Sequence, residues 1–172
     1  NNTFNEMSTQ DMQQLIPLMF VVIIVLSQLI LRSVVGTIST VVIIAMSVLV
    51  TQGAMGGIGY AVTQVNVMIP IIILTLAVCD CVHLLNNYLF NLSKGDDRIA
   101  AMKESLSINF QPIFLTSVTT AIGFLSMNFS DSPPFQDLGN ISAFGVMAAF
   151  VFSMTLFPGI ALLLPMKARK VT

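Results

Sequence analysis

The sequence has few charges, few cysteines and no tryptophan. Only 9% of its 172 residues are charged, whereas an ordinary soluble domain carries roughly 25%. Two cysteines are too few for a disulfide scaffold, and the long apolar runs exclude a disordered chain. The seven Lys and Arg residues form no cluster lined with stacking aromatic rings, so we expect no nucleic-acid partner.

Apolar residues are too numerous for a protein that folds in water. They make up 55% of the chain, and the mean hydropathy is +0.89. A small soluble domain keeps a mostly polar outer shell, and this composition cannot supply one. The sequence therefore predicts an all-α membrane protein. The motifs HExxH and GxSxG are absent, so we do not expect an enzyme.

Five stretches are long enough to cross a membrane, which takes about 20 mostly apolar residues. Arg32 and Ser33 end the first stretch, so the second must turn straight back. The glycine-rich segment QGAMGGIGY after the second stretch predicts a loop. Pro70 falls in the first turns of the third stretch, and Pro158 predicts a kink in the fifth. The five predicted spans are residues 12–31, 34–52, 65–91, 110–129 and 138–165.

A sixth helix is predicted between the third and fourth spans. Gly95 is a helix stop, and Ile99, Met102 and Leu106 then follow at spacings of three to four residues. This pattern predicts a short amphipathic helix over residues 96–108 that lies on the cytoplasmic membrane surface.

The basic residues predict the orientation of the spans. All seven fall on one side of the predicted membrane, which by the positive-inside rule is the cytoplasm. Residues 166–172 then form a cytoplasmic tail, and residues 1–11 lie outside. The chain begins with Asn1 and carries no signal sequence, so we expect residues 1–11 to end an upstream domain. The basic residues are Arg32, Lys94, Arg98, Lys103, Lys167, Arg169 and Lys170.

Polar residues inside the third span are the main functional clue. Asp80, His83 and Asn87 are separated by three and seven residues, which on a helix puts all three on one face. An ionised carboxylate at mid-bilayer costs at least about 2.5 kcal/mol, so this face should point at other helices or at water.

The fourth span carries a matching stripe of small and hydroxyl-bearing residues. Thr116, Thr119, Thr120 and Gly123 lie within about 100° of one another on a helix. Such a surface allows close helix packing and offers hydrogen bonds to a carboxyl group. We therefore expect the third span to pack against the fourth, with Asp80 against the threonines. A desolvated carboxyl of this kind can gain and lose a proton, as a proton-driven transporter requires.

Simpler interpretations exist for each of these residues. Asp80 is also compatible with a protonated, purely structural hydrogen bond to Thr119 or Thr120, and His83 with polar contacts at the membrane interface. Asp80 and His83 supply only two metal ligands, so we expect neither a metal nor a cofactor. Cys79 and Cys81 point in different directions and are expected to be packing residues.

Several segments resemble one membrane half of a resistance-nodulation-division (RND) exporter of the MMPL branch, a unit similar to sterol-sensing domains. The resemblance covers residues 12–165. Its most specific parts are an Asp-x-x-His-Leu-Leu-x-x-Tyr run from Asp80 to Tyr88 and a Thr-x-x-Thr-x-x-Gly-Phe run. The segments are LRSVVGTIS, GGIGYAVTQVNVMIP, LAVCDCVHLLNNY, QPIFLTSVTTAIGFLSM and FGVMAAFVFSMTLFPGIALLLP.

The resemblance implies a repeat of six helices that lacks its first helix here, with a second repeat downstream. Family members use the proton-motive force, through acids at the Asp80 position, to move lipids or other hydrophobic molecules. Drug-efflux members carry two adjacent acids there, whereas Cys81 follows Asp80 in this chain. We therefore expect the transmembrane unit of a proton-coupled exporter in a bacterial inner membrane, in contact with membrane lipids. A homo-oligomer is compatible with this expectation. The alternative is a lipid- or sterol-sensing module that does not pump.

Overall fold

The computed structural model describes residues 33–59 and 68–164, together with residues 18, 21, 22 and 25. Four of its helices are long and apolar enough to cross a membrane, which confirms an all-α membrane protein. The predicted first span over residues 12–31 and the terminal segments 1–11 and 166–172 lie outside the continuous described ranges. The elements are α2 (Val34–Ile58), α3 (Ile69–Ser93), α4 (Arg98–Leu125), the 3₁₀ helix η2 (Ser126–Phe129) and α5 (Pro133–Leu163).

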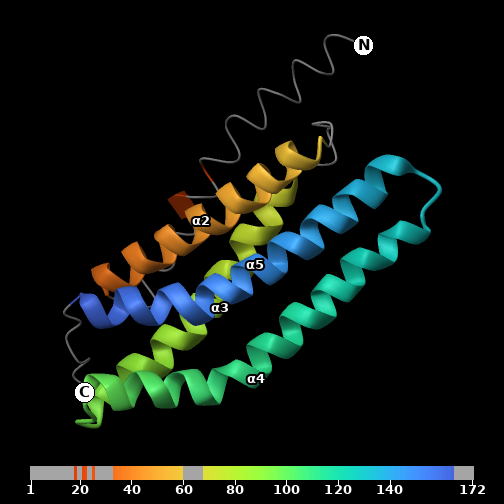
Figure 1. Ribbon diagram of the computed structural model, residues 1–172. Helices are drawn as coiled ribbons and strands as arrows, with labels where there is room; N and C mark the ends of the chain where they lie inside the picture. Colours follow the sequence, from red (N-terminus) through yellow and green to blue (C-terminus); the bar gives the residue numbers. More distant parts are fainter. Residues whose placement is uncertain (1–17, 19–20, 23–24, 26–32, 60–67, 165–172) are drawn as a thin grey trace.

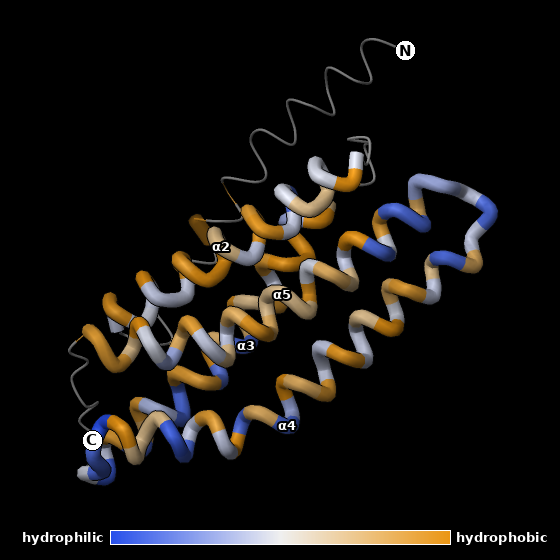
Figure 2. Tube along the Cα trace, in the orientation of Figure 1, coloured by the Kyte–Doolittle hydropathy of each residue, from blue (hydrophilic) through white to orange (hydrophobic). Residues whose placement is uncertain are grey.

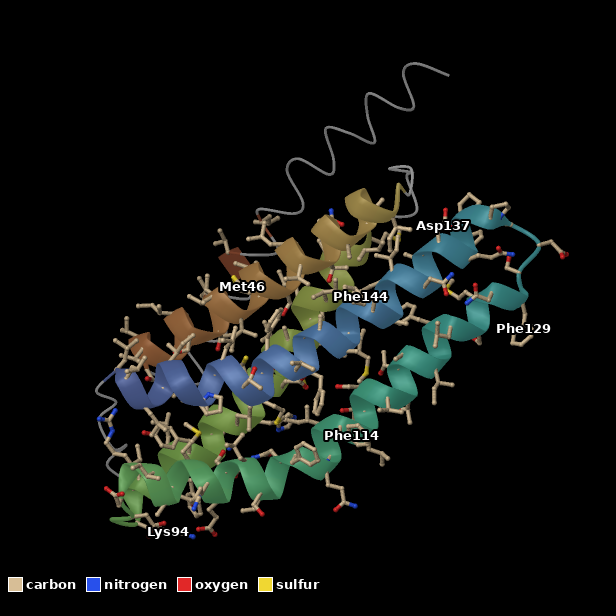
Figure 3. The ribbon with its side chains drawn as sticks, in the orientation of Figure 1. Met46, Lys94, Phe114, Phe129, Asp137 and Phe144 are labelled. Atoms are coloured by element: carbon tan, nitrogen blue, oxygen red, sulfur yellow. The ribbon has the colours of Figure 1, made fainter. Side chains whose placement is uncertain are left out.

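Helix α5 is the centre of the described bundle. It contacts α2, α3, α4 and η2, and in Figure 1 α2 and α4 run along opposite sides of it. Hydrophilic stretches gather at the two ends of the bundle (Figure 2). Lys94 and Asp137 mark these ends in Figure 3, and we call them the Lys94 end and the Asp137 end. Fully buried side chains such as Ile43, Leu84 and Phe157 form the core between them.

The end of α2 differs from the sequence prediction. The segment QGAMGGIGY was expected to be a loop, but the helix continues through it to Ile58 and stops at Gly59, which has a φ of 82°. Each glycine inside a helix costs roughly 1 kcal/mol relative to alanine in water. Within a membrane, however, a backbone that leaves the helix loses hydrogen bonds that no water replaces. The glycine-rich turns therefore stay helical.

Helix α4 also differs from the prediction of a separate surface helix over residues 96–108. That segment and the predicted span over residues 110–129 are one helix, α4, that begins at Arg98 and continues into η2. Pro112 lies inside it, and α4 bends along its length near Phe114 (Figures 1 and 3). Proline removes one hydrogen bond and kinks a helix without ending it when tertiary contacts hold both halves.

The other two helices have a proline in their first turn. Pro70 lies in the first turn of α3, and α5 begins at Pro133, five residues before the predicted start at residue 138. Proline suits this position because its missing N–H would have no partner there. As a result, Asp137 lies in the first turns of α5 rather than in a loop. Pro158 lies within α5, which continues to Leu163.

Candidate functional site

Asp80 is a buried carboxyl near the middle of α3. It is 6% exposed, and within the described part of the chain its side chain forms no hydrogen bond. On the helix it shares a face with Leu84, Asn87 and Asn91, because their offsets of four, seven and eleven residues all fall within about 60°. This face of α3 contacts α4.

A seam of polar contacts joins α3 to the first half of α4. The Asn87 Nδ2 donates to Asn109 Oδ1 at 3.0 Å, and the buried Ser105 hydroxyl donates to the Leu84 carbonyl at 2.7 Å. Asn91 donates to the Ala101 carbonyl at 3.5 Å. Each of these groups would be costly to leave unpaired in a membrane interior. The seam therefore fixes how α3 and α4 pack on the Lys94 side of Asp80.

The seam also fixes what lies opposite Asp80. The two helices are antiparallel, so continuing the pairing of Asn91 with Ala101 and of Asn87 with Asn109 places Asp80 level with the stretch of α4 from Pro112 to Thr116. Pro112 has no N–H and therefore leaves the carbonyl of Ile108 without its usual helical donor. The buried carboxyl of α3 thus lies at the level of the bend in α4.

The threonine stripe does not face Asp80. Thr116 and Thr119 are exposed, and Thr120 is half-buried. The Thr116 hydroxyl donates to the Pro112 and Ile113 carbonyls, and that of Thr119 to the Leu115 and Thr116 carbonyls. A hydroxyl satisfied within its own helix needs no neighbour. The buried face of this half of α4 consists of Ile113, Ser117 and Ala121 instead.

His83 is separated from Asp80 by its orientation. It is exposed, and so are Thr75, Cys79 and Asn86 on the same helix. Their spacings place all four within about 80° on α3, so they form one polar face, which we call the His83 face. Asn87 lies between this face and the seam and is half-buried. The structure therefore brings Asn87 to α4 but directs His83 out of the described bundle.

The cysteines take different positions. Cys79 is exposed and Cys81 is buried, and both thiols are free. The Cys81 Sγ lies 3.9 Å from the Ser153 hydroxyl of α5, a packing contact in the core. No group of three potential metal ligands occurs within the described ranges.

The sequence interpretation missed Asn91, Ser105 and Asn109. The sequence did contain a pattern that includes Ser105 and Asn109. Mostly small residues recur every four positions along α4, and these positions are buried in the structure. The positions in this series are Ala101, Ser105, Asn109, Ile113, Ser117 and Ala121, and Met102 is the one buried residue of α4 outside it.

Four long apolar helices around a buried intramembrane carboxyl define a polytopic membrane protein with an ionisable group in its interior. The sequence profile of the MMPL family matches residues 1–171, and the chain belongs to this family. It is 26% identical over 117 residues to a Methanocaldococcus jannaschii protein named "Putative membrane protein MJ1562". The match covers 68% of this chain and 30% of that relative, so the matched segment spans less than a third of the relative's length. No solved structure matches the chain significantly.

Proposed function

We propose that the chain is the transmembrane unit of a proton-coupled exporter of lipids or other hydrophobic molecules, with Asp80 as the proton carrier. The observation that carries this proposal is a carboxyl that is 6% exposed in a membrane-spanning helix and makes no hydrogen bond to any residue described. A purely structural aspartate would be expected to bond to a neighbour, and the threonines first considered for that role bond to their own helix.

The position of Asp80 suggests how a proton would act. A charged carboxylate at this depth costs at least about 2.5 kcal/mol, whereas the protonated acid is neutral and can donate one hydrogen bond. The bend at Pro112 leaves the backbone carbonyl of Ile108 without its helical donor, in a part of α4 that lies nearly level with Asp80. Protonation would therefore favour a packing in which the acid approaches the bend, and deprotonation would favour a packing that admits water. Such differential stabilisation is how a proton shifts a conformational equilibrium.

The His83 face supports a larger assembly. Polar and ionisable side chains inside a membrane almost always face protein or a water-filled cavity. We therefore propose that a second repeat of the same protein covers this face. His83 would then adjust the Asp80 site or conduct protons to it from one side of the membrane. In this proposal the membrane is a bacterial inner membrane, the N-terminus is extracytoplasmic and the C-terminus is cytoplasmic.

The experiment measures efflux of a lipophilic fluorescent dye, Nile red, from intact cells that express the protein from its own gene. We expect efflux to stop when a protonophore collapses the proton gradient. Asp80→Asn keeps the size of the side chain but cannot ionise, so we expect the variant to retain dye as cells without the protein do. Asp80→Glu restores an ionisable group and should recover part of the efflux.

The matched control is Asp96→Asn. Asp96 is an exposed acid in the connection between α3 and α4, so this change removes the same charge outside the bundle and should leave efflux unchanged. Efflux by Asp80→Asn at the wild-type rate, with normal protein levels in the membrane, would contradict the proposed role.

A further inference from the structure

A small apolar cavity lies between the last turns of α2 and the first turns of α5. It has a volume of about 140 Å³, room for on the order of four or five water-sized groups at about 30 Å³ each. Its one polar side chain, Asn140, is already engaged, because it exchanges two hydrogen bonds with Asn128 of η2. The wall therefore offers hydrocarbon contacts. The lining residues are Ala54, Met55, Ile58, Asn140, Ile141 and Phe144.

An open groove on the surface of α5 adjoins the cavity at Phe144. Phe144 lines both, and the groove has a volume of about 300 Å³ between Phe144 and Phe152. From Asn140 to Phe152 the helix rises about 18 Å, at about 1.5 Å per residue. One leaflet contributes about 15 Å of hydrocarbon, so cavity and groove together match the depth of a single acyl chain. Both begin at the Asp137 end, where α5 enters the bundle.

The charged side chains at the Asp137 end favour some lipid headgroups over others. Asp137 lies on the same face of α5 as Asn140, Ile141 and Phe144, because offsets of three, four and seven residues bring side chains together on a helix. Asp137 is half-buried and lies about one turn before Asn140 of the cavity wall; Figure 3 labels it together with Phe144. The sequence has no Lys or Arg between residues 33 and 93 or between residues 104 and 166. A headgroup here therefore meets a carboxylate and no cation from these segments.

We infer that the cavity and groove bind one acyl chain of a membrane phospholipid whose headgroup carries a primary ammonium group, and that this ammonium pairs with Asp137. The ammonium is a donor that a carboxylate accepts well, whereas a purely anionic headgroup would be repelled. The site is formed by α2 and α5 and does not include Asp80. The inferred lipid site is therefore independent of whether the protein couples transport to protons.

Photolabelling of the purified full-length protein in lipid vesicles tests this site. The vesicles contain equal amounts of phosphatidylethanolamine and phosphatidylglycerol with identical chains, and a trace of one of the two carries a diazirine on an acyl chain. After irradiation, mass spectrometry quantifies labelled peptides. We expect residues 54–58 and 140–152 to be labelled about two- to fivefold more by phosphatidylethanolamine, the range that one partly exposed ion pair supports.

Two pairs of measurements separate a site from general lipid contact. Asp137→Asn should bring the ratio between the two lipids close to one, whereas Asp131→Asn, which removes an exposed acid of the preceding loop, should leave it unchanged. Ala54→Leu fills the cavity and should lower labelling there for both lipids, but not at Ile122 and Leu125, which are exposed on α4.

Equal labelling by both lipids in the wild-type chain, or no excess over the exposed face of α4, would overturn the inference. This comparison needs no variant, so a failure of any substitution to fold does not affect it. Loss of dye efflux in the Asp80 experiment leaves the labelling result intact, and the reverse also holds.

Discussion

Helices α4 and α5 approach each other closely at Gly139, and a single methyl group added there should loosen the Asp137 end. A Cβ at this position would overlap the carbonyl oxygen of Phe124 and lie 3.0 Å from the Cβ of Met127. Neither atom belongs to a flexible side-chain end, so the two helices themselves must move apart. Overpacking of this kind costs typically about 1–3 kcal/mol.

The cost in free energy of unfolding can be measured by comparison with Gly123, a glycine that has free space around it. Gly123 of α4 has no atom within 4 Å of its ideal Cβ position, so Gly123→Ala should give only the gain of about 0.5–1 kcal/mol that alanine brings to a helix interior. Gly139→Ala receives the same gain but loses the close packing. Because the gain is common to both variants, we expect them to differ by the packing cost of about 1–3 kcal/mol in free energy of unfolding, with Gly139→Ala the less stable.

The assay is reversible unfolding in mixed micelles, followed by circular dichroism as the fraction of denaturing detergent is raised. Gly145→Ala provides an intermediate case, because its Cβ would meet the end of the Ile73 side chain at 2.5 Å, and a side-chain end can rotate away. If Gly139→Ala proves as stable as Gly123→Ala, then the helices are not held at the distance that the structure gives, and the packing argument fails.

Two further predictions concern the α3–α4 seam and the Lys94 end. Asn87→Ala and Asn109→Ala, measured singly and together in the same unfolding assay, should show a coupling of about 0.6 kcal/mol, typical of hydrogen bonds between membrane helices; strictly additive effects would exclude the bond seen at 3.0 Å. The Arg98 guanidinium donates to the carbonyls of Ala161 and Leu164 and so holds the last turn of α5. Arg98→Met should therefore destabilise that turn by about 1 kcal/mol, and hydrogen exchange of its amides should become several-fold faster, whereas an unchanged rate would contradict this role.

The positions of the helices could be predicted from the sequence because hydropathy and length report membrane burial directly. The ends of the helices were harder to predict where the helix propensity of a residue and its membrane environment favour different structures. Glycines at the end of α2 and Pro112 in α4 are helix breakers in water, but both lie inside helices here. In a membrane the backbone has no other source of hydrogen bonds, so the environment outweighs intrinsic propensity.

The inward faces of the helices were less predictable. In water an apolar stripe marks the buried side, but in lipid both sides are apolar and the stripe carries little information. The side chains that do carry information are those that cannot satisfy themselves within their own helix. Asp80 and Asn91 belong to this group, and both are buried.

Threonine behaves in the opposite way, and this explains the error on α4. Thr75, Thr116 and Thr119 each donate to a carbonyl of the preceding turn and are exposed, while Thr51 makes the same type of bond and is buried. A membrane threonine therefore gives no indication of which side faces protein. His83 is exposed and forms no hydrogen bond to any residue that the structure describes. Its exposure in this bundle is thus the strongest structural reason to expect further protein, rather than lipid, against that face of α3.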